Sequence, residues 1–149
     1  MAISRGAGTE IIRTALFEEV DNTGRILIFG AQHHIYTVLS VVCEARSVTG
    51  ASDWVRMYLK GYDTVVGETD QDIFIFQEVM TNDQTFVWND KFSFNGHEPT
   101  DFTGPMDSIV KQDAIADQGS SVSQFLFCNG THADDNFEVT VTYIDQNNS

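Results

Sequence analysis

Basic residues are scarce in this 149-residue chain, which has 8 Lys plus Arg against 22 Asp plus Glu and a formal net charge of −14. The only bases after residue 60 are Lys91 and Lys111. Proteins bind nucleic acid through Lys and Arg side chains that release counterions from phosphates, so this composition predicts no nucleic-acid partner. Anionic membrane surfaces are disfavoured for the same reason.

Long apolar runs are also missing. No stretch approaches the ~20 apolar residues that a membrane-spanning helix needs. Met1–Thr14 lacks the apolar segment of a secretory signal peptide, and Ala2 in place of Gly excludes N-myristoylation. We therefore expect no membrane association, and we expect the chain to be made and folded in a cytoplasm.

Cysteine is limited to Cys43 and Cys128, which are too few for a disulfide framework and lack CxxC spacing. Each lies in an apolar stretch. This position favours buried thiols, although one bridge between the two residues is also compatible with the sequence.

The dominant feature that is present is apolar–polar alternation with a period of two, which is typical of half-buried β-strands. Over Asn136–Asp145 the apolar side chains Phe137, Val139, Val141 and Tyr143 fall on one face. Further strands are predicted over Glu10–Val20, Arg25–Phe29, Ile35–Arg46, residues 54–60, Asp72–Met80, Thr85–Trp88, Lys91–Asn95 and Ser121–Cys128.

Several local details accompany these strands. Ile35–Cys43 is almost continuously apolar, which suggests a central strand covered on both faces. A short helix is the rival for residues 54–60, because Trp54 and Tyr58 stand four apart. Asn89-Asp90 has the composition of a tight turn between two strands, and Asp107–Ala116 is the best helical candidate.

About nine strands separated by turns predict an all-β fold, an antiparallel β-sandwich that is jelly-roll-like with at most one short helix. Residues 9–149 are expected to form this single domain. The polar, glycine-containing segment Met1–Gly8 reads as a flexible N-terminal arm that orders on a partner, or as a frayed terminus.

No catalytic pattern is found, since GxSxG, Walker and GxGxxG motifs are all missing. The adjacent acids Glu18-Glu19 and the Asp70/Asp72 pair do not supply two carboxyls held across a cleft. We predict a non-enzymatic protein without a cofactor, with a small hydrolase or metal enzyme as the weaker alternative.

Histidines offer little for a metal site. His33 and His34 point to opposite sides if that stretch is extended, and His97-Glu98 precedes Pro99 without continuing into a HExxH helix. A loop that places His132 beside Asp134-Asp135 is the most plausible place for calcium. We make no metal-site assignment.

Four aromatic residues allow two interpretations. Trp54, Tyr58, Phe86 and Trp88 can form a stacking platform for sugar rings. The opposing interpretation is a core, which the eleven Phe against two Trp favour.

Three stretches, which together cover under a third of the chain, are MAISRGAGTEIIRTALFEEV, TFVWNDKFSFNGHEP and VTVTYIDQNNS. None of them contains a defined chemical motif. Through these stretches the chain resembles small virion structural proteins of tailed bacteriophages, particularly those of aquatic hosts. The resemblance implies a capsid decoration or cement protein, with a neck or tail component as the alternative. It also implies location in the virion after assembly in the host cytoplasm, capsid or tail proteins as partners, and a homo-oligomer, with a trimer favoured.

If the N-terminal segment docks on such a partner, its apolar and basic side chains are the candidate contacts. These are Ile3, Arg5, Ile11 and Arg13. A carbohydrate-binding module that uses Trp54 or Trp88 is the alternative from another functional class.

Overall fold

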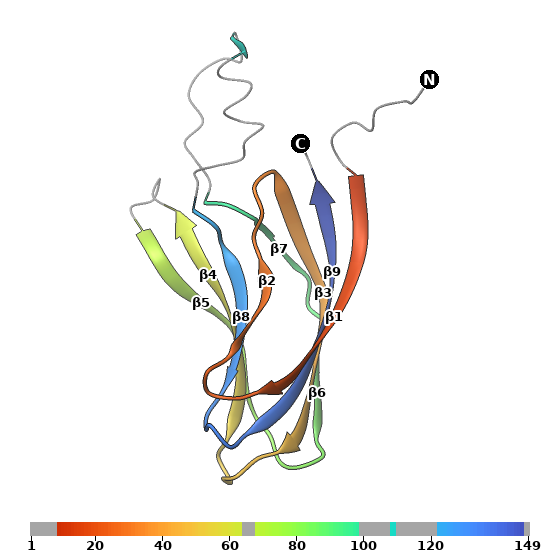
Figure 1. Cartoon of the computed structure of the whole chain (residues 1–149), viewed down its shortest axis with the longest axis vertical. Coiled ribbons are helices and arrows are strands. Elements are labelled where there is room, and N and C mark those ends of the chain that lie inside the picture. The colour runs from red at the N-terminus through yellow and green to blue at the C-terminus, as the bar shows by residue number, and fades with distance from the viewer. Residues whose placement is uncertain (1–8, 64–67, 99–107, 110–121, 148–149) are drawn as a thin grey trace.

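The computed structural model describes residues 9–63, 68–98, 108–109 and 122–147. Its strands form two facing sheets (Figure 1). They are β1 (Thr9–Val20), β2 (Arg25–Phe29), β3 (His34–Ser47), β4 (Trp54–Asp63), β5 (Glu68–Val79), β6 (Thr85–Trp88), β7 (Phe92–Asn95), β8 (Phe125–Gly130) and β9 (Asn136–Asn147).

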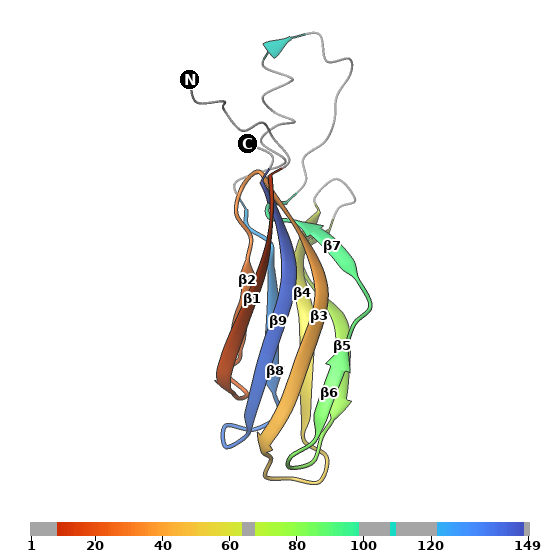
Figure 2. The same cartoon turned by 90° about the vertical axis from the view of Figure 1, so that its right-hand side faces the viewer.

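The strand order is that of a jelly roll. The first sheet has the order β1-β9-β3-β6, with β7 also paired to β3, and the second has the order β2-β8-β4-β5. Every pairing is antiparallel. The pairs are nested along the chain: β1 with β9, β2 with β8, β3 with β6 and β7, and β4 with β5. Figure 2 shows the first sheet in front of the second, so the two sheets pack face to face and the predicted all-β sandwich is confirmed.

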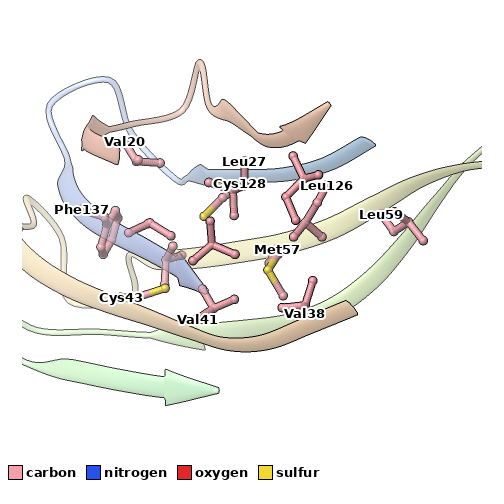
Figure 3. Packing of buried hydrophobic residues seen from close by; sticks show 14 of the residues in the cluster. Val20, Leu27, Val38, Val41, Cys43, Met57, Leu59, Leu126, Cys128 and Phe137 are labelled. Atoms are coloured by element: carbon pink, nitrogen blue, oxygen red, sulfur yellow. The ribbon is translucent and has the colours of Figure 1, made fainter. Parts of the chain in front are cut away.

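The core is the layer between the two sheets. In the first half of β9 the alternation is regular, because Phe137, Val139 and Val141 are fully buried while the residues between them are partly exposed. In Figure 3, Val41 and Cys43 of β3 project into the same layer as Met57 of β4. Each such side chain contributes about 1.5–3 kcal/mol by leaving water, so the period-two pattern selects this arrangement.

Strand β3 is central, as expected, but only one of its faces is buried. Its inward residues Tyr36, Val38, Val41, Cys43 and Ala45 are buried, whereas those between them are partly exposed. The prediction of cover on both faces was wrong. Thr and Ser alternate with aliphatic residues on the outward face, and such a mixture tolerates contact with water.

Two further local expectations are corrected. Residues 54–60 belong to strand β4, and the helical alternative is wrong because their alternation matches the pairing with β5 and β8. Asn89-Asp90 does not reverse the chain, since β6 and β7 both run antiparallel to β3 and follow each other along it. The predicted helix Asp107–Ala116 and the arm Met1–Gly8 lie outside the described residues, apart from residues 108–109.

Strand β8 begins at Phe125 rather than at Ser121, because the residues before it pair elsewhere. Gln124 N–H donates to the Gly96 carbonyl at 2.8 Å, and Gly30 N–H donates to the Gln124 carbonyl at 2.8 Å. A Cβ on Gly30 would lie 1.9 Å from the carbonyl oxygen of Gly96. Only glycine therefore allows the three backbone segments to cross at this point.

Candidate interaction surfaces

Strand β1 is a long edge strand with exposed apolar side chains. It pairs with β9 along one edge, and among the described residues no strand pairs with its other edge. Ile12 is 68% exposed and Leu16 is 56% exposed. Edge strands that expose apolar side chains are prone to pair with other chains, so β1 is a natural contact surface.

The two predicted contact residues that the structure describes both lie on β1. Ile11 and Arg13 stand opposite Asp145 and Tyr143 of β9, on the side of the first sheet that faces the second sheet. Ile12 and Leu16 point to the other side, opposite Ile144 and Thr140. Ile3 and Arg5 lie outside the described residues.

Arg13 is part of a charged cluster that joins three strands of the first sheet. Its Nε donates to Asp145 Oδ2 at 3.0 Å, and Nδ1 of His34 lies 2.5 Å from Asp145 Oδ1. Asp145 is buried, and Tyr36 and Tyr143 pack beside the cluster with ring centroids 6.0 Å apart. Burial raises the pKa of both tyrosines. Two partners for one buried carboxylate indicate a structural role for this cluster.

At the opposite end of the sandwich, two buried carboxylates clamp the loops. Asp53 Oδ2 accepts hydrogen bonds from Gly50 N–H at 2.7 Å and from Thr49 Oγ1 at 3.0 Å. Asp135 Oδ1 accepts from Thr49 N–H at 3.2 Å, and Asp135 Oδ2 accepts from His132 N–H at 3.0 Å. The clamp thus joins the β3–β4 loop to the β8–β9 loop.

The electrostatics of the clamp favour ionised Asp53. Burial acts to raise the pKa of this carboxyl, but the hydrogen bonds from Gly50 and Thr49 and the nearby His132 lower it below its usual value. His132 Nε2 lies 3.4 Å from Asp53 Oδ1, so its imidazole faces Asp53 rather than the neighbouring Asp134. Among the residues that the structure describes, no group of three or more His, Cys, Asp or Glu side chains is placed to hold a metal ion.

The two cysteines meet in the core as free thiols. Cys43 of β3 and Cys128 of β8 are both fully buried, which confirms buried thiols as the state (Figure 3). A hydrogen bond between the two thiols, together with burial, raises the pKa of Cys128 well above its ordinary value. A thiol held in this way is a poor nucleophile.

The outer side of the second sheet carries a band of rings, which we call the aromatic face. Phe29 and Phe125 stack with centroids 6.2 Å apart, and Tyr58 contacts both Phe127 at 5.0 Å and Phe74 at 5.7 Å. Phe29 is 62% exposed and Phe74 is 57% exposed. The aromatic face comprises Ile26, Phe29, Trp54, Arg56, Tyr58, Phe74, Phe125 and Phe127.

Arg56 lies at the centre of the aromatic face. Its guanidinium carbon is 4.5 Å from the ring centre of Trp54 and 4.7 Å from that of Phe74. Such cation–π contacts hold the guanidinium against the rings. Its Nε is buried without a hydrogen-bond partner among the described residues, and so is Oδ1 of Asn129, which stands opposite Arg56 on β8.

The four aromatic residues proposed as one platform do not share a surface. Trp54 and Tyr58 point outward from the second sheet, whereas Phe86 and Trp88 of β6 pack against the core of the sandwich. Their rings contact Phe76, with centroids 5.0 and 6.4 Å apart. The sequence could not show this, because β4 and β6 have the same alternation but belong to different sheets.

No helix in the described residues is long and apolar enough to cross a membrane.

Comparisons with known proteins give only distant likenesses. No protein family model and no curated protein match the chain. The chain is similar to a chain of the Bacillus endospore appendages, which are described as a novel family of disulfide-linked pili. The two chains are 12% identical with a TM-score of 0.42, and the match covers 100% of this chain and 97% of that chain.

Two viral particles contain similar chains. That of the T13 particle of infectious bursal disease virus has 11% identity and a TM-score of 0.39, and the match covers 99% of this chain but only 37% of that one. The similar chain of the cowpea mosaic virus top component has 15% identity and a TM-score of 0.34, and the match covers 95% of this chain and 86% of that one. At these scores the likenesses carry no argument about function.

Proposed function

We propose that this protein is a non-enzymatic virion structural protein that attaches to a viral particle through protein–protein contacts. Its first proposed role is that of a capsid decoration or cement protein, and a neck or tail component is the alternative. The observation that carries the proposal is the exposure of apolar side chains on two ordered surfaces, the β1 edge and the aromatic face.

Physical reasoning links these surfaces to assembly. Monomeric proteins rarely expose contiguous apolar patches beyond a few hundred Å², and larger ones mark interaction sites. The jelly roll is an architecture of both capsid domains and lectins, so the fold is compatible with a structural role in a virion and also with a carbohydrate-binding role. A protein that binds only the assembled particle stabilises that particle by mass action.

Ile11 and Arg13, with Ile3 and Arg5 before them, remain the proposed contacts with the capsid or tail. In this role the apolar side chains supply the buried area and the bases oppose acidic groups of the partner. Arg13 is half-exposed, so it can reach a partner carboxylate while keeping its bond to Asp145.

The test uses particles of the virus that encodes the chain, prepared without it. Purified protein is added, particles are sedimented, and the bound fraction and the temperature of particle disruption are measured. We expect saturable binding and a raised disruption temperature, weakened by deletion of residues 2–8 and by Ile11→Ser. Val87→Ser, at an exposed site on β6, is the matched control and should bind like wild type. Failure of the wild-type protein to sediment with particles would refute the proposal.

A carbohydrate-binding module is the second candidate, favoured by the row of partly exposed rings on one sheet face. Arg56 already covers one face of the Trp54 ring, which leaves less of it for stacking on a sugar. Tryptophan fluorescence during titration with oligosaccharides tests this candidate, because stacking on Trp54 would change its emission.

A further inference from the structure

We infer that the aromatic face of one copy of this protein binds strand β1 of a second copy, so that subunits associate head to tail. This inference deepens the proposed assembly function by naming a partner. It concerns contact between copies, whereas the proposed function concerns contact with a particle.

The aromatic face has the composition of an interface centre. Interfaces are enriched in Trp, Tyr, Phe and Arg, and the residues that contribute most binding energy are Trp, Tyr and Arg. Trp54, Arg56 and Tyr58 supply one of each on the outward side of β4. Arg56 is already held against two rings, so little side-chain freedom is lost when a partner covers it.

The charge of this face is unusual for the molecule. Its neighbour Lys60 is paired with Asp72 at 2.8 Å, whereas Arg56 has no carboxylate partner among the described residues. Among the described residues, Arg56 thus gives the face one positive charge that no carboxylate neutralises, in a chain whose net charge is −14. The face suits an occupant that presents apolar side chains flanked by carboxylates.

The outward side of β1 has that character. Glu10, Ile12, Thr14 and Leu16 are all exposed, and so is Glu18 at the bulge that follows; we call these residues the β1 ridge. They place two apolar residues between two acids. No salt bridge engages Glu10 or Glu18 among the described residues, whereas the one base of the strand, Arg13, is bound to Asp145.

The dimensions of the two surfaces agree. Four residues along a strand place Ile12 and Leu16 about 13 Å apart, and the four strands of the second sheet span about 14 Å. The two apolar side chains can therefore lie across the whole width of the aromatic face.

One subunit cannot join its own two surfaces. The β1 ridge is on the outer side of the first sheet, and the aromatic face is on the outer side of the second sheet (Figures 1 and 2). A contact between different surfaces of identical subunits is heterologous, and it builds a ring if the rotation closes or a filament if it does not.

The experiment measures absolute mass by light scattering during size-exclusion chromatography across a range of concentrations. Wild type should exceed the monomer mass of 16.6 kDa as concentration rises. Phe74→Glu in the aromatic face and Ile12→Lys in the β1 ridge should each weaken association at least about tenfold in Kd, because each removes an apolar contact and buries a charged group in the interface. Both sites are exposed, so circular dichroism should show an unchanged fold, and Val87→Lys is the control that should associate like wild type.

Mixing the two variants is the decisive step. Phe74→Glu keeps its ridge and Ile12→Lys keeps its aromatic face, so an equimolar mixture should form a 1:1 heterodimer while each variant alone stays monomeric. Self-association of Ile12→Lys alone, or a mixture that stays monomeric, would overturn the head-to-tail contact.

A wild-type protein that is monomeric at every concentration would also overturn this inference. If that monomer still sediments with particles, the proposed virion function stands and only the contact between copies is lost. If that monomer's tryptophan emission responds to oligosaccharides, the aromatic face is a sugar site.

Discussion

Replacing Phe137 by Ala tests the packing on which the fold rests. Phe137 is the largest fully buried side chain among the described residues, and it lies on β9 opposite Ala45 of β3 and Val20 of β1. A Cβ on Gly130 of β8 would lie 2.9 Å from the ring, so the second sheet packs directly on this residue. The neighbours cannot collapse into the space without moving backbone.

We therefore expect Phe137→Ala to lower the free energy of unfolding by about 3–5 kcal/mol. Domains of this size unfold with about 5–15 kcal/mol in total, so the variant should be marginal. At about 2–4 °C per kcal/mol, the melting temperature should fall by roughly 6–20 °C. Urea denaturation followed by circular dichroism measures the difference.

The matched control is Phe29→Ala, which removes the same side chain from an exposed site on the aromatic face. Its effect on stability should stay within about 0.5–1.5 kcal/mol, because it removes only the stack of this ring on Phe125. A loss below about 1 kcal/mol for Phe137→Ala, or equal losses for the two variants, would refute the reasoning that the two sheets pack on Phe137.

Asp53, Gly30 and the two core cysteines each offer a separate test of the structure. Because the pKa of Asp53 is lowered in the folded state, the stability that this carboxylate contributes is present above its unfolded pKa of about 4 and is lost as the pH falls through the lower folded value. Urea titrations at several pH values should show that Asp53→Asn flattens this decline in stability. Parallel pH curves for the variant and wild type would contradict the prediction. Gly30→Ala should cost at least ~2 kcal/mol, because its Cβ would meet backbone atoms. Gly61→Ala should change stability by less than ~1 kcal/mol, because its Cβ would meet only side-chain atoms of Ile73 and Gln124. Thermal melts compare the two variants. Cys43 and Cys128 should react with Ellman's reagent in urea but not in the native protein, because both thiols are fully buried. Rapid labelling of the native protein would contradict this and would show that the core opens locally.

Much of the strand content could be predicted because the period-two alternation reports directly on burial. Arg25–Phe29 and Thr85–Trp88 have the predicted bounds, and Phe137, Val139 and Val141 are buried as their spacing indicates. Strand order was out of reach, since it depends on pairings such as that of Ile11 with Asp145, which lie far apart in the chain. Local pattern has no information about such partners.

The surfaces were harder to predict than the core. Ile12 and Leu16 have the alternation of a buried strand, and only the position of β1 at the edge of a sheet exposes them. The clamp of Asp53 and Asp135 also escaped prediction, because the two loops that hold these acids meet only after the sheets have packed.

If this protein is a structural part of a virion, as proposed, it must be present in purified particles. Quantitative mass spectrometry of particles of the encoding virus measures this. The proposal predicts the chain in a fixed ratio to the major shell or tail protein, preparation after preparation. Its absence from purified particles, with the protein found only in the infected cell, would contradict the claim.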